Sequence, residues 1–422
     1  MNDVYKNKFN KSIENSKFLL LNKIDQDYIK KISFEYKFSF SQIQELINFS
    51  IDFNMWNEKS IKDIFKDEYS SRKDAFNHIR NIWDYLKKRP NDYSSFDKNM
   101  YKNDRKISFH TKIKDSISLG SCPVASTNTR CCNLMTLDAV ESCGFDCSYC
   151  SIQSFYKQDK ITFDSNFATK LSKLKLDPNK SYHIGTGQSS DSLMWGNKEG
   201  VLDALFEFAR LNINVILEFK TKSNNIRYFL ENDVPSNIIC TWSLNTPTII
   251  KNEEHLSASL DQRLKSARLL SNKGVLVGFH FHPIVVYKDY LKDYKEVFNR
   301  VLNMFTYKEV VLISFGTLTF IKPVINMIRK RDFKSKILQM PFENANGKQS
   351  YSLDLKEEMF KFAYDSFKPW HDDVYFYLCM EDQSLWKKVF GYEYSSNEEM
   401  ENAMKNSYNS KIEHLSKSIV GC

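Results

Sequence analysis

Between residues 130 and 345 the sequence alternates short β-rich runs with longer segments of helical periodicity. The β-rich runs contain many β-branched and aromatic residues and cover 181–187, 213–221, 238–245, 275–286 and 309–318. Helical stretches stand between them at 202–211, 259–274 and 293–305. Strands and helices that alternate at these lengths form parallel βαβ units. With a further strand expected at 136–142, about six such units predict an α/β fold built around a partial (βα)6 barrel.

The sequence on either side of this region has a different character. The first hundred residues contain almost no Gly or Pro and place apolar residues at helical spacing, most clearly in 41–51 and 75–86. Ser39 or Ser41 can cap the first of these helices. The last part returns to helical and aromatic character, with one further strand expected at 374–378. We therefore expect a helical N-terminal domain, the barrel, and a mainly helical C-terminal region that caps it, at 1–105, 106–345 and 346–422.

The composition is that of a globular protein, with 42% hydrophobic and 27% charged residues. No apolar run approaches the roughly 18 residues that a membrane-spanning helix needs, and the N-terminus is a poor secretory signal. We therefore expect a cytoplasmic protein without a membrane partner. The nine cysteines, an odd number, fit a reducing compartment better than a set of disulfides. The net charge of +8 is too small to establish a nucleic-acid partner by itself.

Cys143, Cys147 and Cys150 form a C-x3-C-x2-C triplet behind the first expected strand. Three thiolates at this spacing can ligate three irons of a [4Fe-4S] cluster, which normally has four protein ligands, and the fourth iron then stays open to a small molecule. A structural zinc site is the alternative, but it needs a fourth ligand at matching spacing. The next cysteine is Cys240 and His183 stands alone, so the triplet favours an iron-sulfur site.

Polar residues follow the later strands, where a βα barrel places its chemistry. Ser190 follows one strand, Lys222 ends the next, and Ser243 ends the strand after that. Such hydroxyl and ammonium groups can bind the amino and carboxylate groups of a ligand, although a lone lysine at a strand end is more often a solvated rim residue. His280 and His282 lie on one side of a further strand, either as metal ligands or as paired core histidines.

Together these segments resemble the spore photoproduct lyase family of radical S-adenosylmethionine (SAM) enzymes, which repair a thymine dimer formed in spore DNA. The resemblance covers roughly residues 130–385 and rests on several blocks in the right order. The blocks are the cysteine triplet, Ser189 to Asp191, Phe219 to Lys222, Trp242 to Asn245, Glu254, Asp261 to Leu264, Gly278, and His282 to Ile284. The family implies a radical SAM barrel of the partial (βα)6 type, with a [4Fe-4S] cluster and SAM as cofactors.

The resemblance also implies roles for individual residues. The implied metal ligands are Cys143, Cys147 and Cys150. The positions that match residues holding the methionyl part of SAM are Ser190, Lys222 and Ser243. The candidate catalytic residue is Tyr149. It matches a tyrosine that the lyases use near the radical pathway.

Two positions depart from the family pattern. Gln188 stands where the lyases have a hydrogen-donor cysteine, and Ser151 stands where they have a second tyrosine. An amide cannot donate a hydrogen atom as a thiol can, so the final quench of a thymine radical lacks its usual source. Other cysteines that could take this role are Cys122, Cys131, Cys132 and Cys379.

The sequence thus predicts a lyase-like radical SAM enzyme that uses a 5'-deoxyadenosyl radical to abstract hydrogen from a thymine photolesion. Its expected partners are DNA and an electron donor such as flavodoxin or ferredoxin. One alternative keeps the radical chemistry but changes the substrate to a modified nucleoside, RNA or a metabolite. Another alternative is a non-catalytic, cluster-bearing nucleic-acid-binding protein. Ser190, Lys222 and Ser243 argue against this last alternative, because a structural cluster needs no SAM pocket.

Overall fold

The computed structural model describes residues 2–14, 16–66, 68–96, 105–117, 119–122, 128–156, 159–345 and 347–420. Contacts divide the chain into two compact units. Unit 1 contains residues 1–104, 286–288 and 319–351. Unit 2 contains residues 105–285, 289–318 and 352–422. The expected division into three domains stays a prediction, because contacts alone do not decide which parts of a chain fold independently.

Unit 1 is mainly helical. Its helices are α1 (Asn2–Glu14), α2 (Lys23–Tyr36), α3 (Phe40–Met55), α4 (Ile61–Ile64), α5 (Arg72–Lys88) and α12 (Lys322–Ile328). Helices are present at both segments where the sequence predicts them, and Ser39 caps α3 by accepting the Gln42 N–H in a capping box. A small antiparallel sheet completes the unit, in the order β13 (Thr319–Ile321), β15 (Lys348–Ser350) and β14 (Glu343–Ala345).

A buried ion pair joins the helices of unit 1. Asp52 of α3 is fully buried and accepts two hydrogen bonds from Arg329, at 2.8 Å from Nε and 2.6 Å from Nη2. Trp83 of α5 donates a third hydrogen bond to the same carboxylate, at 2.9 Å. Arg329 directly follows α12, so one carboxylate fixes three helical segments that are far apart in sequence.

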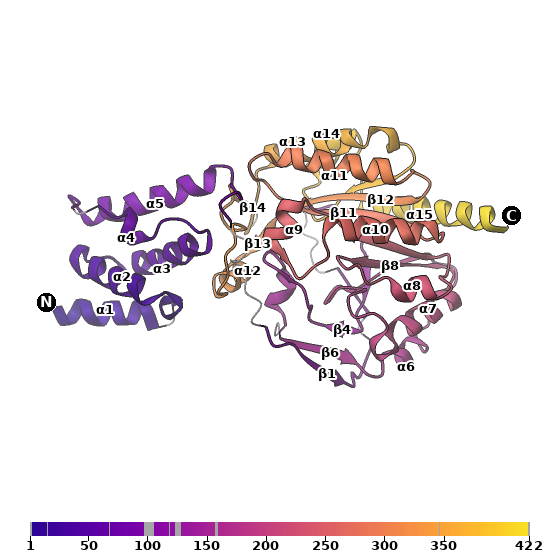
Figure 1. Ribbon diagram of the computed structural model, residues 1–422, viewed down its shortest axis with the longest axis horizontal. Coiled ribbons are helices and arrows are strands. Elements are labelled where there is room, and N and C mark those ends of the chain that lie inside the picture. The colour runs from indigo at the N-terminus through magenta and orange to yellow at the C-terminus, as the bar shows by residue number, and fades with distance from the viewer. Residues whose placement is uncertain are drawn as a thin grey trace. The chain divides into compact units, whose positions relative to one another are not determined.

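Unit 2 is built on a curled, eight-stranded sheet (Figure 1) in the order β16-β12-β11-β9-β8-β7-β3-β2. The strands are β2 (Leu119–Ser121), β3 (Met135–Leu137), β7 (Tyr182–Thr186), β8 (Val215–Thr221), β9 (Ile238–Ser243), β11 (Leu276–Ile284), β12 (Val310–Thr317) and β16 (Tyr375–Leu378). Only β2 runs antiparallel to its neighbour, while the other neighbouring pairs in this sheet are parallel. The predicted α/β half-barrel is confirmed, and the number of six βα repeats stays a prediction.

Helices connect the parallel strands and lie on the outer side of the sheet (Figure 1). The helices are α7 (Val201–Leu211), α8 (Arg227–Glu231), α10 (Leu260–Asn272), α11 (Tyr290–Met304) and α13 (Leu353–Ser366). After β16, which is the strand expected at 374–378, the chain continues through α14 (Ser384–Phe390) into α15 (Asn397–Val420). Helix α15 contacts β8, β12 and β16. The C-terminal region therefore both adds an edge strand to the main sheet and packs against it.

The first strand is shorter than the predicted 136–142. The main-sheet strand β3 ends at Leu137, and the chain then forms β4 (Val140–Glu141) in a separate sheet with β6 (Lys160–Asp164) and β1 (Ser108–Lys112). Between the two strands, the Asp138 carboxylate accepts a hydrogen bond from the Ser189 N–H at 2.9 Å. This bond holds the chain at the carboxyl end of β3, and the residues that follow leave the main sheet. The cysteine triplet consequently follows β4.

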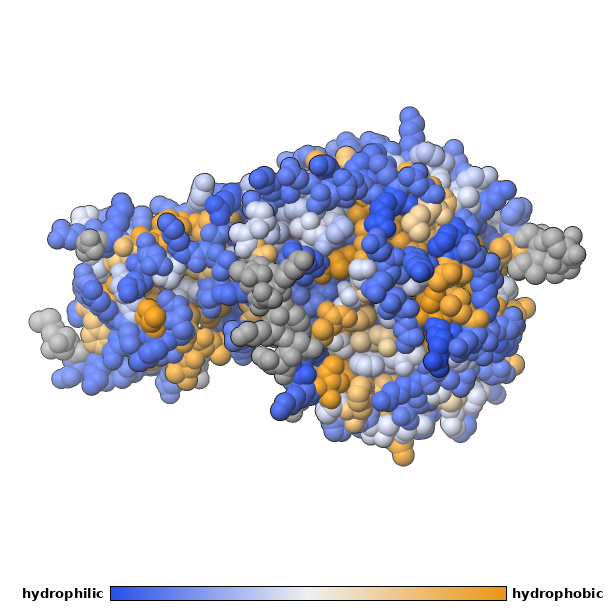
Figure 2. Space-filling model, viewed as in Figure 1, coloured by the Kyte–Doolittle hydropathy of each residue, from blue (hydrophilic) through white to orange (hydrophobic). Residues whose placement is uncertain are grey.

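Among the described residues, no helix is long and apolar enough to cross a membrane. The face shown in Figure 2 is mostly hydrophilic, with hydrophobic residues scattered over it. Exposed apolar side chains such as Val4, Leu19 and Ile213 lie far apart in the sequence.

We predict that Asp52→Ala destabilises unit 1 by about 3 kcal/mol or more, because Arg329 and Trp83 both lose their buried partner. Urea unfolding followed by tryptophan fluorescence measures the change. Asp27→Ala is the matched control, because Asp27 forms an exposed ion pair with Lys23 and should contribute less than about 1 kcal/mol. Similar losses of stability in the two variants would contradict the importance of the buried pair.

Candidate functional site

The cysteine triplet occupies the loop that follows β4. Cys147 is buried in β5 (Asp146–Cys147), whereas Cys143 and Cys150 are half-buried. Burial raises the pKa of Cys143 well above its usual range, and the nearby Asp191, Cys150 and Cys147 add to the rise. The three thiols are therefore close enough to affect one another. An iron-sulfur cluster binds its cysteines as thiolates, so a bound cluster would have to hold Cys143 in its ionised form.

A single metal ion fits the site less well than a cluster. In the part of the chain that the structure describes, no three His, Cys, Asp or Glu side chains are grouped so that they could hold one metal ion. A single ion needs its ligands around one point, whereas a cubane takes one thiolate at each of three separate irons. Whether the three thiols hold a cluster with an open iron stays a prediction.

Arg105 holds the backbone of the cysteine loop. Its guanidinium donates hydrogen bonds to the carbonyl oxygens of Gly144 and Phe145, at 3.3 and 3.2 Å. It also donates to the carbonyl oxygen of Cys143 at 3.3 Å and forms an ion pair with Asp146 at 3.7 Å. Three consecutive carbonyl groups thus point to one cation. We infer that Arg105 fixes the curvature of the loop that carries the first two cysteines.

The loop after β7 packs closely against the cysteine loop. A Cβ atom on Gly144 would lie only 2.4 Å from Met194 Cε and 2.7 Å from Trp195 Cη2, so a larger residue here would displace these two side chains. Cys143 Sγ lies 3.8 Å from Met194 Sδ. Trp195 Nε1 donates a hydrogen bond to the Ser190 hydroxyl at 3.1 Å. The predicted cluster loop and the predicted SAM-binding Ser190 therefore meet through Met194 and Trp195.

Asp191 ties the loop after β7 to the end of β8. Its carboxylate accepts hydrogen bonds from the Thr221 hydroxyl and the Lys222 N–H, both at 2.7 Å. It also accepts from the N–H groups of Leu193 and Met194, both at 3.0 Å. Burial raises the pKa of Asp191 in spite of these four bonds. Because Asp191 neighbours Ser190, its bonds fix the position of Ser190 relative to Lys222.

A buried network connects Tyr149 with the end of β9. Glu254, in β10 (Glu254–His255), accepts hydrogen bonds from the Tyr149 hydroxyl and from Arg263 Nη2, the latter at 2.6 Å. Arg263 also donates to the carbonyl oxygen of Ser243 at 2.8 Å. Both charged side chains are almost completely buried. Burial alone would raise the pKa of Glu254, but Arg263 and Lys222 outweigh it and lower the pKa, so the carboxylate stays ionised.

Lys222 stands beside both the tyrosine and the cysteines. Its Nζ lies 5.8 Å from the centre of the Tyr149 ring. Burial opposes the charged form of Lys222, but Glu254 and Cys147 outweigh it and raise its pKa above the ordinary value. The strands β10 and β5 are antiparallel, with Glu254 opposite Cys147. This pairing keeps a charged ammonium group next to the cysteine loop, where it can meet an anionic ligand group.

The structure gathers the predicted site residues around the carboxyl ends of β7, β8 and β9 and the adjoining loop. They are Cys143, Cys147, Tyr149, Cys150, Ser190, Lys222 and Ser243. The two residues that depart from the lyase pattern lie in the same region: Gln188 is half-buried in the loop after β7, and Ser151 is exposed directly after Cys150. The structure fixes where all of these residues lie, and their chemical roles stay predictions.

Some residues that position the site were missed from the sequence. Arg105 lies 38 residues before Cys143, and no local pattern marks it as a partner of that loop. Met194 and Trp195 carry no sequence signal of a site, because apolar residues after a strand usually indicate packing. The pairing of Glu254 with Arg263 could have been suspected, since both fall in the blocks shared with the lyases.

His280 and His282 belong to a hydrogen-bond network inside the half-barrel. His280 Nε2 lies 2.8 Å from one oxygen of Glu218, and His183 Nε2 lies 2.8 Å from the other. His282 Nε2 lies 3.0 Å from the Ser314 hydroxyl. Burial would raise the pKa of Glu218, but its hydrogen bonds with His183 and His280 outweigh burial and hold the pKa well below its usual range. Of the two readings for this pair, the structure supports core histidines.

Comparison with known proteins points to one family. A family model described as spore photoproduct lyase matches residues 141–357, slightly more than half of the chain. The curated spore photoproduct lyase of Clostridium acetobutylicum is 28% identical over 180 residues, which cover 41% of this chain and 53% of that protein. The match therefore spans about half the length of this relative.

Solved structures of spore photoproduct lyase are similar in fold. A mutant with bound AdoMet and dinucleoside spore photoproduct aligns with a TM-score of 0.54 and 16% identity, over 80% of this chain and 94% of that chain. A complex with dinucleoside spore photoproduct aligns with a TM-score of 0.53 and 15% identity over the same shares. At such identities the likeness concerns the fold, and the chemistry has to be argued from the site.

We predict that Arg105→Ala lowers the iron and sulfide content of the anaerobically reconstituted protein severalfold. The loop would lose three hydrogen bonds to a charged group, each worth about 1.5–3 kcal/mol. Iron and acid-labile sulfide per chain are measured after desalting. Arg227→Ala is the matched control, because its exposed side chain pairs with the exposed Glu231 at 3.5 Å. If the Arg105→Ala protein bound as much iron and sulfide per chain as the control, cluster binding by the loop would not depend on Arg105.

Proposed function

From the premise that the chain belongs to the spore photoproduct lyase family, we propose that it is a radical SAM enzyme with a partial (βα)6 barrel. Cys143, Cys147 and Cys150 would hold a [4Fe-4S] cluster. The observation that carries the proposal is the charged Lys222 beside both Cys147 and Tyr149, at the edge of the sheet where ligands bind in βα folds. A purely structural cluster requires no such cation at its side.

The residues around the cluster loop suit the amino acid part of SAM. Lys222 would pair with the carboxylate of SAM, because an ammonium group and a carboxylate form a charge-assisted hydrogen bond. The Ser190 hydroxyl, which accepts from Trp195, can still donate to the ligand. Ser243 would add a third polar contact from the end of β9. Asp191 and Arg263 hold these three residues in place through the bonds described above.

The protein's own part in the chemistry is to position groups and to control protons. When bound, the cluster would supply the electron that cleaves SAM to methionine and a 5'-deoxyadenosyl radical. Burial, followed by the charges of Glu254 and Cys147, raises the pKa of Tyr149 well above its usual range. Its phenol therefore keeps the proton and donates it in a hydrogen bond to Glu254. We propose that this neutral tyrosine lies beside the radical pathway.

A thymine photolesion in DNA is the proposed substrate. The support is the family membership, together with solved relatives that bind dinucleoside spore photoproduct. The expected partners are DNA and a small electron donor such as flavodoxin or ferredoxin. An oxygen-sensitive cluster also favours the reducing cytoplasm as the place of action.

A second candidate keeps the radical chemistry and changes the substrate to a modified nucleoside, RNA or a metabolite. The observation in its favour is Gln188, which stands half-buried in the loop after β7 at the position of the lyases' hydrogen-donor cysteine. A non-catalytic, cluster-bearing nucleic-acid-binding protein is less well supported. Such a protein would need no buried network of Glu254, Arg263 and Lys222 beside the cluster, because it would bind no SAM there.

We predict that the anaerobically reconstituted protein forms 5'-deoxyadenosine from SAM in the presence of dithionite. Lys222→Ala should raise the KM for SAM about tenfold or more, because a hydrogen bond to a charged group is worth about 1.5–3 kcal/mol. Product is quantified by chromatography at several SAM concentrations. Lys361→Ala is the control, because Lys361 forms an exposed pair with Glu357 on α13 and should leave the KM unchanged. A protein that carries a full cluster and never cleaves SAM would refute both enzyme proposals.

We predict that the enzyme slowly repairs a spore photoproduct dinucleotide to the undamaged thymidine dinucleotide. Gln188→Cys should accelerate this conversion roughly tenfold or more, since a thiol donates hydrogen atoms and an amide does not. Gln188→Ser is the matched control, because it changes the side chain without adding a thiol. Repair is followed by chromatography alongside SAM cleavage. If the wild type and Gln188→Cys both cleave SAM and leave the dinucleotide intact, the photolesion is not the substrate. The second candidate, a modified nucleoside, RNA or metabolite as the substrate, would then be favoured.

A further inference from the structure

The inner face of the half-barrel carries polar side chains in successive layers. Glu218 of β8 accepts a hydrogen bond from the Thr241 hydroxyl of β9 at 2.6 Å and lies 2.8 Å from His280 Nε2 of β11. Strand β9 separates β8 from β11 in the sheet, so these side chains meet over its inner face. Side chains two residues apart on a strand point to the same face. The next layer, which we call the second layer, therefore consists of Lys220, Ser243 and His282.

Lys220 and His282 are the accessible members of the second layer. Glu218 and His280 in the layer below are buried, whereas Lys220 and His282 are half-buried. Burial, and next the positive charge of Lys220, hold the pKa of His282 well below its usual range, which agrees with a position beside the lysine. The Lys220 ammonium group has no hydrogen-bond or ion-pair partner among the described residues. A ligand inside the half-barrel can therefore reach these two side chains, above a floor of buried ones.

A chain of hydrogen bonds fixes where the protons of the two β11 histidines lie. Glu218 is ionised and only accepts, so His280 donates to it through Nε2. Burial lowers the pKa of His280 to about 4, so its Nδ1 carries no proton and accepts from the Ser314 hydroxyl at 2.6 Å. The Ser314 oxygen in turn accepts from His282 Nε2 at 3.0 Å. Neutral His282 therefore has an unprotonated Nδ1.

The Nδ1 atom of His282 is a hydrogen-bond acceptor that a ligand can reach. It has no partner in the part of the chain that the structure describes, and it remains open to solvent. The Nδ1 atom of His183, which also bonds to Glu218, is by contrast buried without a partner. The second layer thus offers one donor, the Lys220 ammonium group, beside one acceptor. An anionic group suits this pair poorly, because its oxygens would face the lone pair of Nδ1, whereas a carbonyl oxygen next to an N–H suits both atoms.

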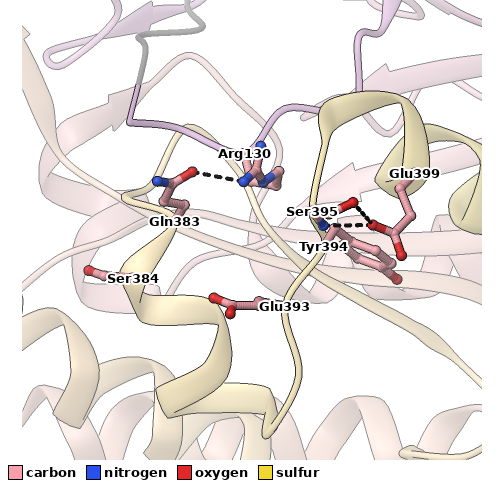
Figure 3. A pocket seen from close by; sticks show the side chains of 7 residues that line it. All are labelled: Arg130, Gln383, Ser384, Glu393, Tyr394, Ser395 and Glu399. Carbon is pink, nitrogen blue, oxygen red and sulfur yellow. Dashed lines mark hydrogen bonds between the residues drawn. The ribbon is translucent and has the colours of Figure 1, made fainter.

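Polar groups that line a cavity elsewhere in unit 2 are already bonded to one another (Figure 3). This cavity has a volume of about 550 Å³ and lies beside residues 383–399. Arg130 donates to Gln383 Oε1 at 2.9 Å, and the Ser395 hydroxyl donates to Glu399 at 2.6 Å. A ligand there would have to replace these bonds, whereas the donor and the acceptor of the second layer stand open.

We propose that Lys220 and His282 bind the carbonyl and N–H edge of a thymine base of the substrate. Lys220 donates to a carbonyl oxygen of the base, and His282 Nδ1 accepts from its N3–H. Enzymes that act on a nucleobase read its Watson–Crick edge through hydrogen bonds of this kind. The two contacts rest on the proposed function, because they take a thymine lesion as the substrate. They add to it the side chains that select the base.

Titration calorimetry tests the lysine contact. The full-length, reconstituted protein is titrated with spore photoproduct dinucleotide in the presence of SAM and without a reductant, so that no turnover occurs. Lys220→Met should raise the Kd for the dinucleotide about tenfold or more, because a hydrogen bond from a charged donor is lost. Lys265→Met is the matched control, because Lys265 is exposed on α10 and should leave the Kd unchanged. An unchanged Kd in Lys220→Met would overturn the proposal.

Two variants of His282 separate base recognition from a structural role. The side-chain amide of asparagine reaches the position of Nδ1, whereas that of glutamine reaches the position of Nε2. His282→Gln should therefore keep the bond to Ser314 and bind the dinucleotide about fivefold more weakly than the wild type. His282→Asn should lose the bond to Ser314 and bind the dinucleotide within about twofold of the wild type. The opposite order of affinities would give His282 a structural role and contradict the proposed contact.

Modified photoproducts test the contacts in the wild type, even if a variant fails to fold. Methylation of the dinucleotide at N3 should weaken its binding about tenfold, because the N–H that His282 accepts is lost, and less than about twofold in His282→Gln. A dinucleoside photoproduct without the phosphate should lose the same factor in Lys220→Met as the dinucleotide does. A loss confined to the dinucleotide would mean that Lys220 binds the phosphate, and equal binding of the methylated photoproduct by the wild type would remove the base contact.

SAM cleavage distinguishes the failure of these contacts from the failure of the proposed function. A protein that never forms 5'-deoxyadenosine with dithionite fails as a radical SAM enzyme, whatever its affinity for the photoproduct. If it cleaves SAM, and both Lys220→Met and His282→Gln bind the photoproduct as tightly as the wild type, only the base contacts fail. In Lys220→Met the Kd for the photoproduct should change more than the KM for SAM. An equal or larger change in the KM would assign Lys220 to the cofactor and overturn the proposal.

Discussion

The buried ion pair between Glu254 and Arg263 is the interaction on which the site depends. Glu254 binds the Tyr149 hydroxyl and helps to keep Lys222 charged, while Arg263 binds the backbone of Ser243. Charges this deeply buried are tolerated only when each is paired, and removal of one partner typically costs about 3–5 kcal/mol. Because the pair sits where β10 meets β5, it also fixes the strand that contains Cys147. One interaction therefore places the cysteine loop against the ends of the barrel strands.

Two further contacts complete this arrangement from other directions. Asp191 connects the loop after β7 with the end of β8, and Arg105 gathers the carbonyl groups of the cysteine loop. Gly144 allows Met194 and Trp195 to approach that loop without a clash. The result is a set of thiols, a cation and hydroxyls that come from four separate segments of the chain: the cysteine loop and the ends of β7, β8 and β9. Such a set can bind a charged amino acid group beside a metal cluster, which is the basis of the proposed SAM chemistry.

Much of this could be predicted from the sequence, because strand ends in a βα fold converge on one edge of the sheet. That rule placed Ser190, Lys222 and Ser243 near the cysteine triplet before their contacts were known. The first strand was predicted too long, because a run of residues such as 136–142 does not reveal that Asp138 binds the Ser189 backbone and ends the main-sheet pairing. Arg105 could not be predicted either, since its three carbonyl partners carry no sequence signal. The role of His280 and His282 remained ambiguous because Glu218, the partner of His280, lies 62 residues away from it.

The most direct test of the central claim is electron paramagnetic resonance of the reduced cluster, recorded with and without SAM. If Cys143, Cys147 and Cys150 leave one iron open and Lys222 holds the SAM carboxylate beside it, SAM should change the spectrum of the wild type. The same concentration of SAM should change the spectrum of Lys222→Ala much less. A wild-type spectrum that is identical with and without saturating SAM would contradict the account, because the cluster would then have no open iron within reach of the cofactor.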